Sequence, residues 1–191
     1  MPNSFVIQPI QKNDEPFLRE MLAQSIYLEP DDPVLRSQLM NLPEISHYVD
    51  GWGQPHDYGF VAVDATSQQS LGAIWLRLFA SYERGYGYVD DHTPEVCTLC
   101  VAAMHRGRGI GTALMHALLD YVDAHYVAVS LSCDPHNPAM HLYERCGFVV
   151  VGESGTSYTL LRTRSMTNSD LVGFPKPARS GCAILRVRNS V

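Results

Sequence analysis

The sequence lacks any apolar run near the ~20 residues that a membrane-spanning helix requires. Its first residues, MPNSFVIQPI, lack the basic region and long apolar core of a secretory signal. Basic residues are also scarce, and the net charge of −6 argues against a general nucleic-acid binder, which needs a basic surface to neutralise phosphates. We therefore expect a cytoplasmic protein that binds neither membranes nor nucleic acid, although a local cationic pocket for a small ligand remains possible.

Cysteine is too sparse and too irregularly spaced for a disulfide framework. The chain has five cysteines, an odd number, and reduced thiols fit this pattern better than disulfides. The run CTLC at 97–100 resembles half of a zinc knuckle, but no second pair follows. In a strand, residues three apart point to opposite faces. We therefore expect no metal site.

A chain of 191 residues suits one well-packed domain. Hydrophobic periodicity and turn residues predict an alternation of strands and helices around one sheet, a mixed α/β (α+β) fold. The predicted strands are 4–10, 58–64, 71–79, 95–101, 127–133 and two within 148–164; the predicted helices start at 13, 32 and 110, with a short one in 135–148. Residues 43–59 and 80–94 read as loops. We place the domain at 1–164 and a C-terminal extension at 165–191, with one strand-like piece at 182–188.

The segment HRGRGIGTALM, His105 to Met115, places three glycines and two arginines at the start of a predicted helix. From Ile110 the apolar positions follow helical spacing, so the helix packs on the sheet. The first backbone N–H groups of a helix have no internal partner, and the dipole is positive there. Glycines allow close approach to these groups, and Arg106 and Arg108 add charge. The turn suits a phosphate or pyrophosphate; the alternative is a tight loop with solvated arginines.

The glycine spacing disfavours two common nucleotide motifs. A Walker loop needs Gly-Lys-Ser/Thr, which is absent, and Gly107, Gly109 and Gly111 do not fit G-x-G-x-x-G. The segment Arg106-Gly-Arg-Gly-Ile-Gly111 instead resembles the acetyl-CoA pyrophosphate loop, R-x-x-G-x-G, of the GCN5-related N-acetyltransferases (GNAT superfamily). HNPAMHLYERCGF (136–148) resembles the second cofactor motif of that family, with a one-residue shift at Ala139. The resemblance covers about residues 58–163.

The resemblance implies a mostly antiparallel central sheet, flanked by helices and splayed at the central strand. It further implies that acetyl-CoA is the co-substrate, and that an amine attacks its thioester directly in a ternary complex. The pantetheine arm would lie along Leu99, Cys100 and Val101, with the Val101 N–H polarising the acetyl carbonyl. The remaining cofactor contacts implied are Arg106, Gly107, Arg108, Gly109, Ile110, Gly111, Thr112, Asn137 and Tyr143. Asn137, followed by proline, also suits a helix cap.

Two residues are the candidate catalytic groups. Neutralising a lysine-like ammonium at pH 7 costs about 4–5 kcal/mol, so a carboxylate base is expected. Glu95, which starts the predicted central strand, occupies the position of the glutamate base in protein-acetylating members of the family. Alternation places it on one face with Cys97, Leu99 and Val101; the alternative is a surface glutamate. Tyr143 matches the family's general acid for the departing thiolate, or else it only packs the helix.

The acceptor is expected between the N-terminal helical segment and the loop 80–94. Tyr88, Asp90, Asp91 and Trp52 are the candidate contacts with a cationic amine, and the two aspartates are also reserve bases. Small amines and peptides or proteins remain open as acceptors, as do monomeric and homodimeric states. Two other functions are open: a non-catalytic acyl-CoA sensor, and a nucleotide-binding regulator built on the glycine turn.

Overall fold

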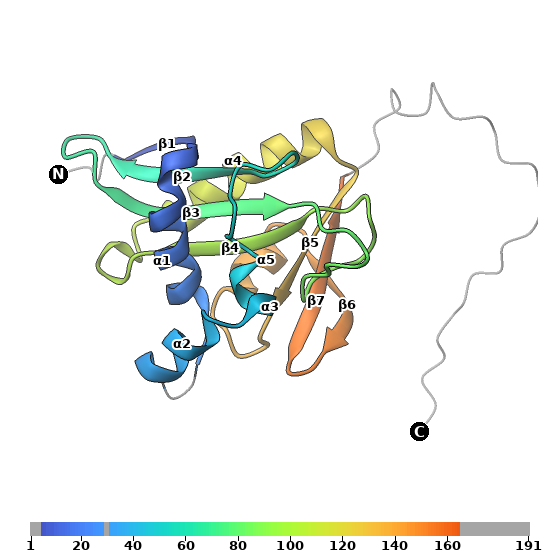
Figure 1. Cartoon of the computed structure of the whole chain (residues 1–191). Helices are drawn as coiled ribbons and strands as arrows, with labels where there is room; N and C mark the ends of the chain where they lie inside the picture. The colour runs from blue at the N-terminus through green and yellow to red at the C-terminus, as the bar shows by residue number, and fades with distance from the viewer. Residues whose placement is uncertain (1–4, 29–30, 165–191) are drawn as a thin grey trace, which may run out of the picture.

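The computed structural model describes residues 5–28 and 31–164, which fold around one seven-stranded sheet (Figure 1). The strand order is β1-β2-β3-β4-β5-β7-β6, and only β4 and β5 pair in parallel. The strands are β1 (Phe5–Pro9), β2 (Tyr58–Asp64), β3 (Ser70–Arg77), β4 (Glu95–Val101), β5 (Ala128–Cys133), β6 (Val149–Ser154) and β7 (Ser157–Thr163). The predicted mixed, mostly antiparallel sheet is confirmed.

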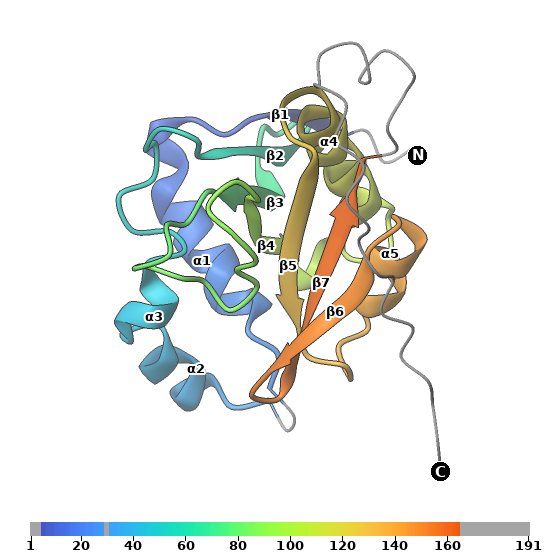
Figure 2. The ribbon, with the colours of Figure 1, turned by 90° about the vertical axis from the view of Figure 1, so that its right-hand side faces the viewer.

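The helices lie on both faces of this sheet. They are α1 (Glu15–Ser25), α2 (Pro33–Leu39), α3 (Pro43–Ser46), α4 (Ile110–His125) and α5 (Met140–Arg145), with 3₁₀ turns η1 (Lys12–Asp14) and η2 (Ala103–His105). Helix α1 packs on β3 and β4, and α4 crosses the opposite face (Figure 2). A cluster around Trp75, Leu18 and Met21 fills the α1 side, and a larger one around Leu114, Leu118 and Ile74 fills the α4 side.

Helix α4 forms where the apolar spacing predicts it. The helical spacing from Ile110 predicts an apolar stripe at positions 110, 113, 114, 117, 118, 121 and 122. Ile110, Leu114, Leu118 and Val122 are buried as predicted, but Met115 and Leu119 are buried in place of positions 113, 117 and 121, which are half-buried. The stripe therefore turns slightly around the helix axis, because the helix crosses several strands and is covered over a broad arc. His116 and Asp120 face water as expected. The result is a helix fixed to the sheet along its length.

The predicted loop at 43–59 is wrong in one part, since Pro43–Ser46 form the short helix α3. Proline at a first helical position costs no hydrogen bond, because that N–H has no partner in a helix. The extension 165–191, with its strand-like piece 182–188, lies outside the described residues. Within the described ranges, no helix is long and apolar enough to cross a membrane.

A β-bulge in β4 changes which side chains share a face. Trp75 pairs with Thr98 and Leu76 with Val96, so Cys97 is an extra residue on β4. An extra residue shifts the alternation of side chains beyond it. Cys97 and Cys100 therefore both pack against the α1-side cluster, whereas Leu99 and Val101 pack against the α4 side. The expectation that Glu95, Cys97, Leu99 and Val101 share one face is wrong, as is the expectation that Cys97 and Cys100 oppose each other.

Strands β4 and β5 diverge almost from their first contact. They pair at a single position, Glu95 opposite Ser130, and β5 then continues its pairing with β7 alone. From Val96 onward, the edge of β4 that faces β5 is open. The predicted splay at the central strand is therefore present, and it opens a gap within the sheet next to α4 and α5 (Figure 2).

Candidate active site

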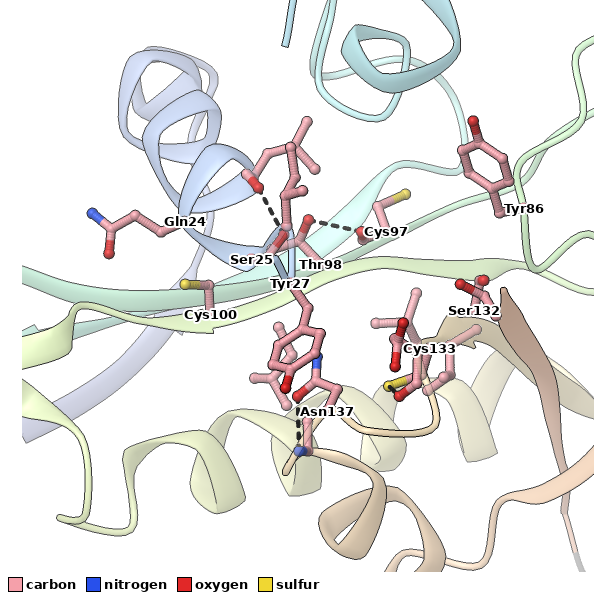
Figure 3. Close-up of a pocket in the computed structure, with 18 of the residues that line it drawn as sticks. Gln24, Ser25, Tyr27, Tyr86, Cys97, Thr98, Cys100, Ser132, Cys133 and Asn137 are labelled. Carbon is pink, nitrogen blue, oxygen red and sulfur yellow. Dashed lines mark hydrogen bonds between the residues drawn. The ribbon is translucent and has the colours of Figure 1, made fainter. Parts of the chain in front are cut away.

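A cleft of about 990 Å³ follows this gap through the molecule. Its walls are β4 from Glu95 to Val101 and the end of β5 from Leu131 to Asp134. The end of α1 and the residues that follow it, 24–28, close one side, and Asn137 to Ala139 close the other. Figure 3 shows Tyr27 and Asn137 approaching each other from these two sides, with Cys133 and Ser132 on the β5 wall. A cleft with several polar groups between apolar walls is the usual form of a small-molecule site.

Glu95 carries a buried carboxyl group at the position where β4 and β5 begin to diverge. The residue is only 2% exposed, yet it lines the cleft. Its Oε1 accepts hydrogen bonds from the Tyr48 hydroxyl at 2.9 Å and from the Gly87 N–H at 2.8 Å. Its Oε2 is buried without a hydrogen-bond partner among the described residues. Burial raises the pKa of Glu95 to about 7, and these two hydrogen bonds oppose the rise.

The loop 80–94 covers Glu95 with two glycines. A Cβ atom at Gly85 would overlap Glu95 Oε2 and lie 2.7 Å from Tyr48 Oη. A Cβ at Gly87 would lie 2.9 Å from Glu95 Oε1 and 2.5 Å from the backbone of Leu131. Only glycine therefore allows the loop to pack this closely on the carboxylate. The Gly- and Tyr-rich composition of this loop has a specific structural cause.

Tyr48 is held firmly in place after α3. The indole N–H of Trp75 donates to the Tyr48 carbonyl at 2.9 Å, and the Tyr48 ring packs edge-on against Phe79. Arg77 donates to the carbonyl of the preceding His47 and forms a buried ion pair with Asp57 at 2.8 Å. These contacts join the segment around Tyr48 to β3. The hydroxyl that meets Glu95 consequently has a defined position.

Tyr143 of α5 lies on the cofactor side of the cleft. The side chain is buried and packs edge-on against Phe148, and it lines the cleft near Cys133. Burial raises the pKa of Tyr143, and Cys133 and Cys100 contribute to the rise. Its hydroxyl therefore stays protonated at neutral pH and can donate a proton or hydrogen bond. Cys133, labelled in Figure 3, lines the same cleft from the β5 side.

The start of α4 offers free hydrogen-bond donors. Gly109 has φ +78° and no side chain caps the helix, so its first intrahelical bond runs from Ala113 N–H to the Gly109 carbonyl at 3.0 Å. The N–H groups of Ile110, Gly111 and Thr112 precede that bond. Gly107 also has a positive φ, and no atom lies within 4 Å of a Cβ at Gly107 or Gly109. The turn is open to an anion from outside.

The two arginines of the turn differ in position. Arg106 lines the cleft and donates from Nε to the Val101 carbonyl at 2.9 Å. Arg108 instead contacts His105 Nδ1 at 3.0 Å, outside the cleft lining. The residues Gly107 to Thr112 lie beyond the lining as well, at the Arg106 end of the cleft. Of the predicted anion-binding set, Arg106 is thus the side chain that connects the turn to the cleft.

Asn137 orders the segment between β5 and α5. Its side-chain oxygen accepts from the Ala139 N–H at 2.9 Å, and its carbonyl accepts from Met140 at 3.0 Å. The expected capping role is therefore carried out one turn before the helix begins at Met140. The residue also lines the cleft opposite Tyr27 (Figure 3).

The four predicted acceptor contacts do not line the cleft. Trp52 is 5% exposed and packs against Trp75 in the core. Tyr88 donates to Asp91 at 2.6 Å, and Asp90 accepts from the His92 N–H within the same exposed loop. The expectation that these four residues line the site is therefore not met, and the tyrosines that line the cleft include Tyr27, Tyr48 and Tyr86. Composition did not distinguish which tyrosines face inward, because that depends on how the loops fold over β4.

Cys97 and Cys100 show no arrangement suited to metal binding. Both pack against the α1-side cluster, and within residues 5–28 and 31–164 no three His, Cys, Asp or Glu side chains gather as possible ligands. Burial raises the pKa of both thiols. The four cysteines in the described part of the chain are reduced.

Comparison with known proteins gives the family and the fold. The family model described as Acetyltransferase (GNAT) family matches residues 21–148. A PaiA N-acetyltransferase from Thermoplasma acidophilum in complex with coenzyme A is 17% identical, with TM-score 0.60, over 84% of this chain and 99% of that one. NAA60 from Arabidopsis thaliana in complex with a bisubstrate analogue is 21% identical, with TM-score 0.55, over 84% and 98%.

Mutant forms of the spermidine/spermine N-acetyltransferase SpeG from Vibrio cholerae are 21% identical, with TM-score 0.54, over 88% of this chain and 98% of that one. No curated protein sequence matches the chain. The structural neighbours support the fold, and the family model covers more than half of the chain, including both glycine-turn and Asn137 motifs. The chain therefore belongs to the acetyltransferase (GNAT) family.

Proposed function

We propose that the protein transfers the acetyl group of acetyl-CoA to a primary amine by direct attack within a ternary complex. The observation that carries this proposal is Glu95, a carboxylate buried in the cleft, with its pKa raised by burial to about 7. A base with a pKa near the working pH combines a large ionised fraction with useful basicity. Buried ionisable groups in a cleft are typical of functional sites.

The turn before α4 and Arg106 would hold the diphosphate of acetyl-CoA. The uncapped N–H groups of Ile110 to Thr112 and the open space at Gly107 and Gly109 fit such an anion. Arg106 adds a charge at the entrance to the cleft. Arg108, which contacts His105, would contribute to the field around the turn.

The gap between β4 and β5 would take the pantetheine arm. Ala102 donates its N–H to the Leu71 carbonyl of β3, and backbone groups of successive residues point to opposite edges of a strand. The N–H and carbonyl of Val101 therefore face the gap, consistent with the Arg106 bond to that carbonyl. The Val101 N–H would polarise the acetyl carbonyl, a contribution of about 3–4 kcal/mol for one such donor.

The two titratable side chains would complete the reaction. Ionised Glu95 would receive the proton of the acceptor ammonium, so that a neutral amine attacks the carbonyl carbon. Tyr143, protonated at neutral pH, would donate its proton to the thiolate of coenzyme A as the C–S bond breaks. Glu95 of β4 and Tyr143 of α5 both line the same cleft, so a base and an acid would be present around one thioester.

The acceptor would enter beside Tyr27 and Tyr86 (Figure 3). Solved neighbours include a spermidine acetyltransferase and the NatC complex bound to Gag peptide and CoA. We therefore include both a small amine and a peptide N-terminus as acceptors of the acetyl group. An aromatic rim beside a carboxylate favours a cationic group in either case.

Thiol release from acetyl-CoA, followed with a panel of amines, amino acids and peptides, tests this function. We expect release with at least one acceptor, and calorimetric binding of acetyl-CoA but not of NAD or ATP. Binding of acetyl-CoA without turnover on any acceptor would favour the acyl-CoA sensor instead. Binding of a nucleotide without binding of acetyl-CoA would contradict both.

A further inference from the structure

Both carboxylate oxygens of the proposed base are enclosed. Glu95 is 2% exposed, Gly85 lies against Oε2, and Oε1 already accepts from Gly87 and Tyr48. An ammonium group in the cleft therefore meets a carboxylate whose Oε2 is buried and whose Oε1 already has two donors. A group that touches both the cleft and Glu95 Oε1 can carry a proton between them.

Tyr48 is such a group. It lines the cleft, and its hydroxyl donates to Glu95 Oε1 at 2.9 Å while accepting from the Tyr86 N–H. A phenol oxygen has one proton to donate and two acceptor positions. One acceptor position of Tyr48 Oη is therefore left for a further donor, next to Tyr86, which also lines the cleft.

We propose that Tyr48 is a further catalytic residue, which relays the proton from the acceptor ammonium to Glu95. The ammonium N–H donates to Tyr48 Oη and its proton moves to that oxygen as the Tyr48 proton moves to Glu95 Oε1. The N–H and Oη–H bonds break, and new Oη–H and Oε1–H bonds form. The products are a neutral amine, an unchanged tyrosine and a protonated Glu95, so charge and atoms balance. This inference rests on the proposed acetyl transfer.

The surroundings of Tyr48 favour a relay over a tyrosinate base. Burial raises the pKa of Tyr48, and the neighbouring Glu95 carboxylate raises it further. A free tyrosinate would be costly beside that carboxylate, so the two protons must move together. The other ionisable groups that face Glu95 are Cys97 of β4, whose thiol pKa is also raised by burial and by Glu95, and Arg77 of β3, which is engaged with Asp57.

The hydroxyl also has the fixed geometry that a relay requires. The bonds from Trp75 and Arg77 hold the backbone around Tyr48, and the Tyr48 ring lies between Phe79 and Tyr86. A side chain fixed in this way keeps its hydrogen bond to Glu95 without rearrangement. Phenylalanine at position 48 would keep this packing and lose only the proton-carrying atom.

The test compares Tyr48→Phe with the unmodified protein on two acceptors of nearly the same shape. These are 2-phenylethylamine, an ammonium at pH 7, and 2,2-difluoro-2-phenylethylamine, whose fluorines lower the amine pKa so that the neutral form predominates. The relay predicts that Tyr48→Phe lowers kcat on 2-phenylethylamine about 100-fold, but changes kcat on the fluorinated amine less than about threefold. Tyr82→Phe, which removes the hydroxyl of a tyrosine that is 89% exposed in the same loop region, is the matched control and should change neither rate.

Each other outcome overturns the relay in a distinguishable way. Equal losses on both acceptors would assign Tyr48 a positioning role for Glu95 alone. Unchanged rates on both would exclude it from the reaction. If the unmodified protein binds acetyl-CoA but acetylates neither these amines nor any acceptor of the wider panel, the proposed acetyl transfer fails first and the relay fails with it.

Discussion

Glu95 and Ser130 form the only register pair between β4 and β5, and the cleft opens directly beyond them. The Glu95 carboxyl group thus lies where β4 and β5 begin to diverge. Parallel pairing at this one position joins the two strands, and β5 pairs with β7 along its whole length. Burial at the point where the strands diverge raises the pKa of Glu95, so the splay creates the cleft and also the environment of the proposed base.

Glu95→Gln should remove the inflection near pH 7 from the pH profile of turnover. Only ionised Glu95 accepts a proton, and its pKa is about 7. For the unmodified protein kcat/KM should therefore rise about tenfold per unit below pH 7 and level off above it. The variant should be at least about 100-fold slower at pH 8, and its kcat/KM should keep rising up to pH 8.5, because without a base only the free fraction of an amine with a pKa of about 10.4 reacts. A retained inflection near 7 would assign it to another group.

The same substitution should also remove a pH effect on the free energy of unfolding. Folding raises the pKa of Glu95 from 4.5 to about 7, so the native state holds this proton more tightly than the unfolded chain. Stability from this group is full below pH 4.5, falls as pH rises to about 7 and is constant above. The difference is about 3 kcal/mol. Urea unfolding at pH 5 and 8 should show that difference shrinking in Glu95→Gln but not in Glu153→Gln, on exposed β6.

Tyr143→Phe should lower kcat by about 10- to 100-fold and leave the affinity for acetyl-CoA nearly unchanged. Phenylalanine retains the packing on Phe148 and removes only the proton donor. Thiol release measures the rate and calorimetry the affinity, with Tyr121→Phe, stacked on Tyr58, as control. Normal turnover in Tyr143→Phe would mean that solvent or another group protonates the leaving thiolate.

Arg106→Gln should weaken acetyl-CoA binding about tenfold. The guanidinium supplies a charge at the cleft entrance, and a charge-assisted hydrogen bond contributes about 1.5–3 kcal/mol. The loss should be smaller at high salt, since screening weakens the same interaction in the unmodified protein. Arg145→Gln, an exposed position on α5, is the control. Equal affinities for both variants would contradict the placement of the diphosphate next to Arg106.

Gly85→Ala should lower kcat clearly, while the protein still folds and its free energy of unfolding falls only moderately. The backbone at Gly85 has no positive φ, so alanine adds no backbone strain, but its Cβ overlaps Glu95 Oε2. Overpacking of this kind costs about 1–3 kcal/mol and forces the loop or the carboxylate to move. Gly152→Ala in β6, where the new Cβ would lie 3.9 Å from Thr159 Cβ, should be nearly neutral. Unfolding curves and kcat for both variants would show whether the close packing matters for catalysis.

Local patterns in the sequence predicted most of the elements. The spacing from Ile110 identified α4, and alternation with turn residues identified the hairpin β2–β3, because each pattern reflects burial against one neighbouring layer. The order of the two cofactor motifs indicated the family before any contact was known. The bulge at Cys97 was not predicted, since it depends on how β3 and β4 align and leaves no mark in the alternation of β4 itself.

The residues of the candidate site also fall into those that local patterns indicate and those that only the folded structure brings to the site. The turn at Gly107–Gly111, Asn137 and Tyr143 are local motifs, and Glu95 follows from its place on the strand before them, so the sequence alone was enough to propose them as candidates. Tyr48, 47 residues before Glu95, and Gly85 reach the carboxylate only when α3 and the loop 80–94 fold over β4. Trp52 was expected at the acceptor and lies in the core for the same reason. Functional groups carried by neighbouring residues can be recognised in the sequence. The burial that shifts the pKa of Glu95 arises from segments that come together only in the folded chain.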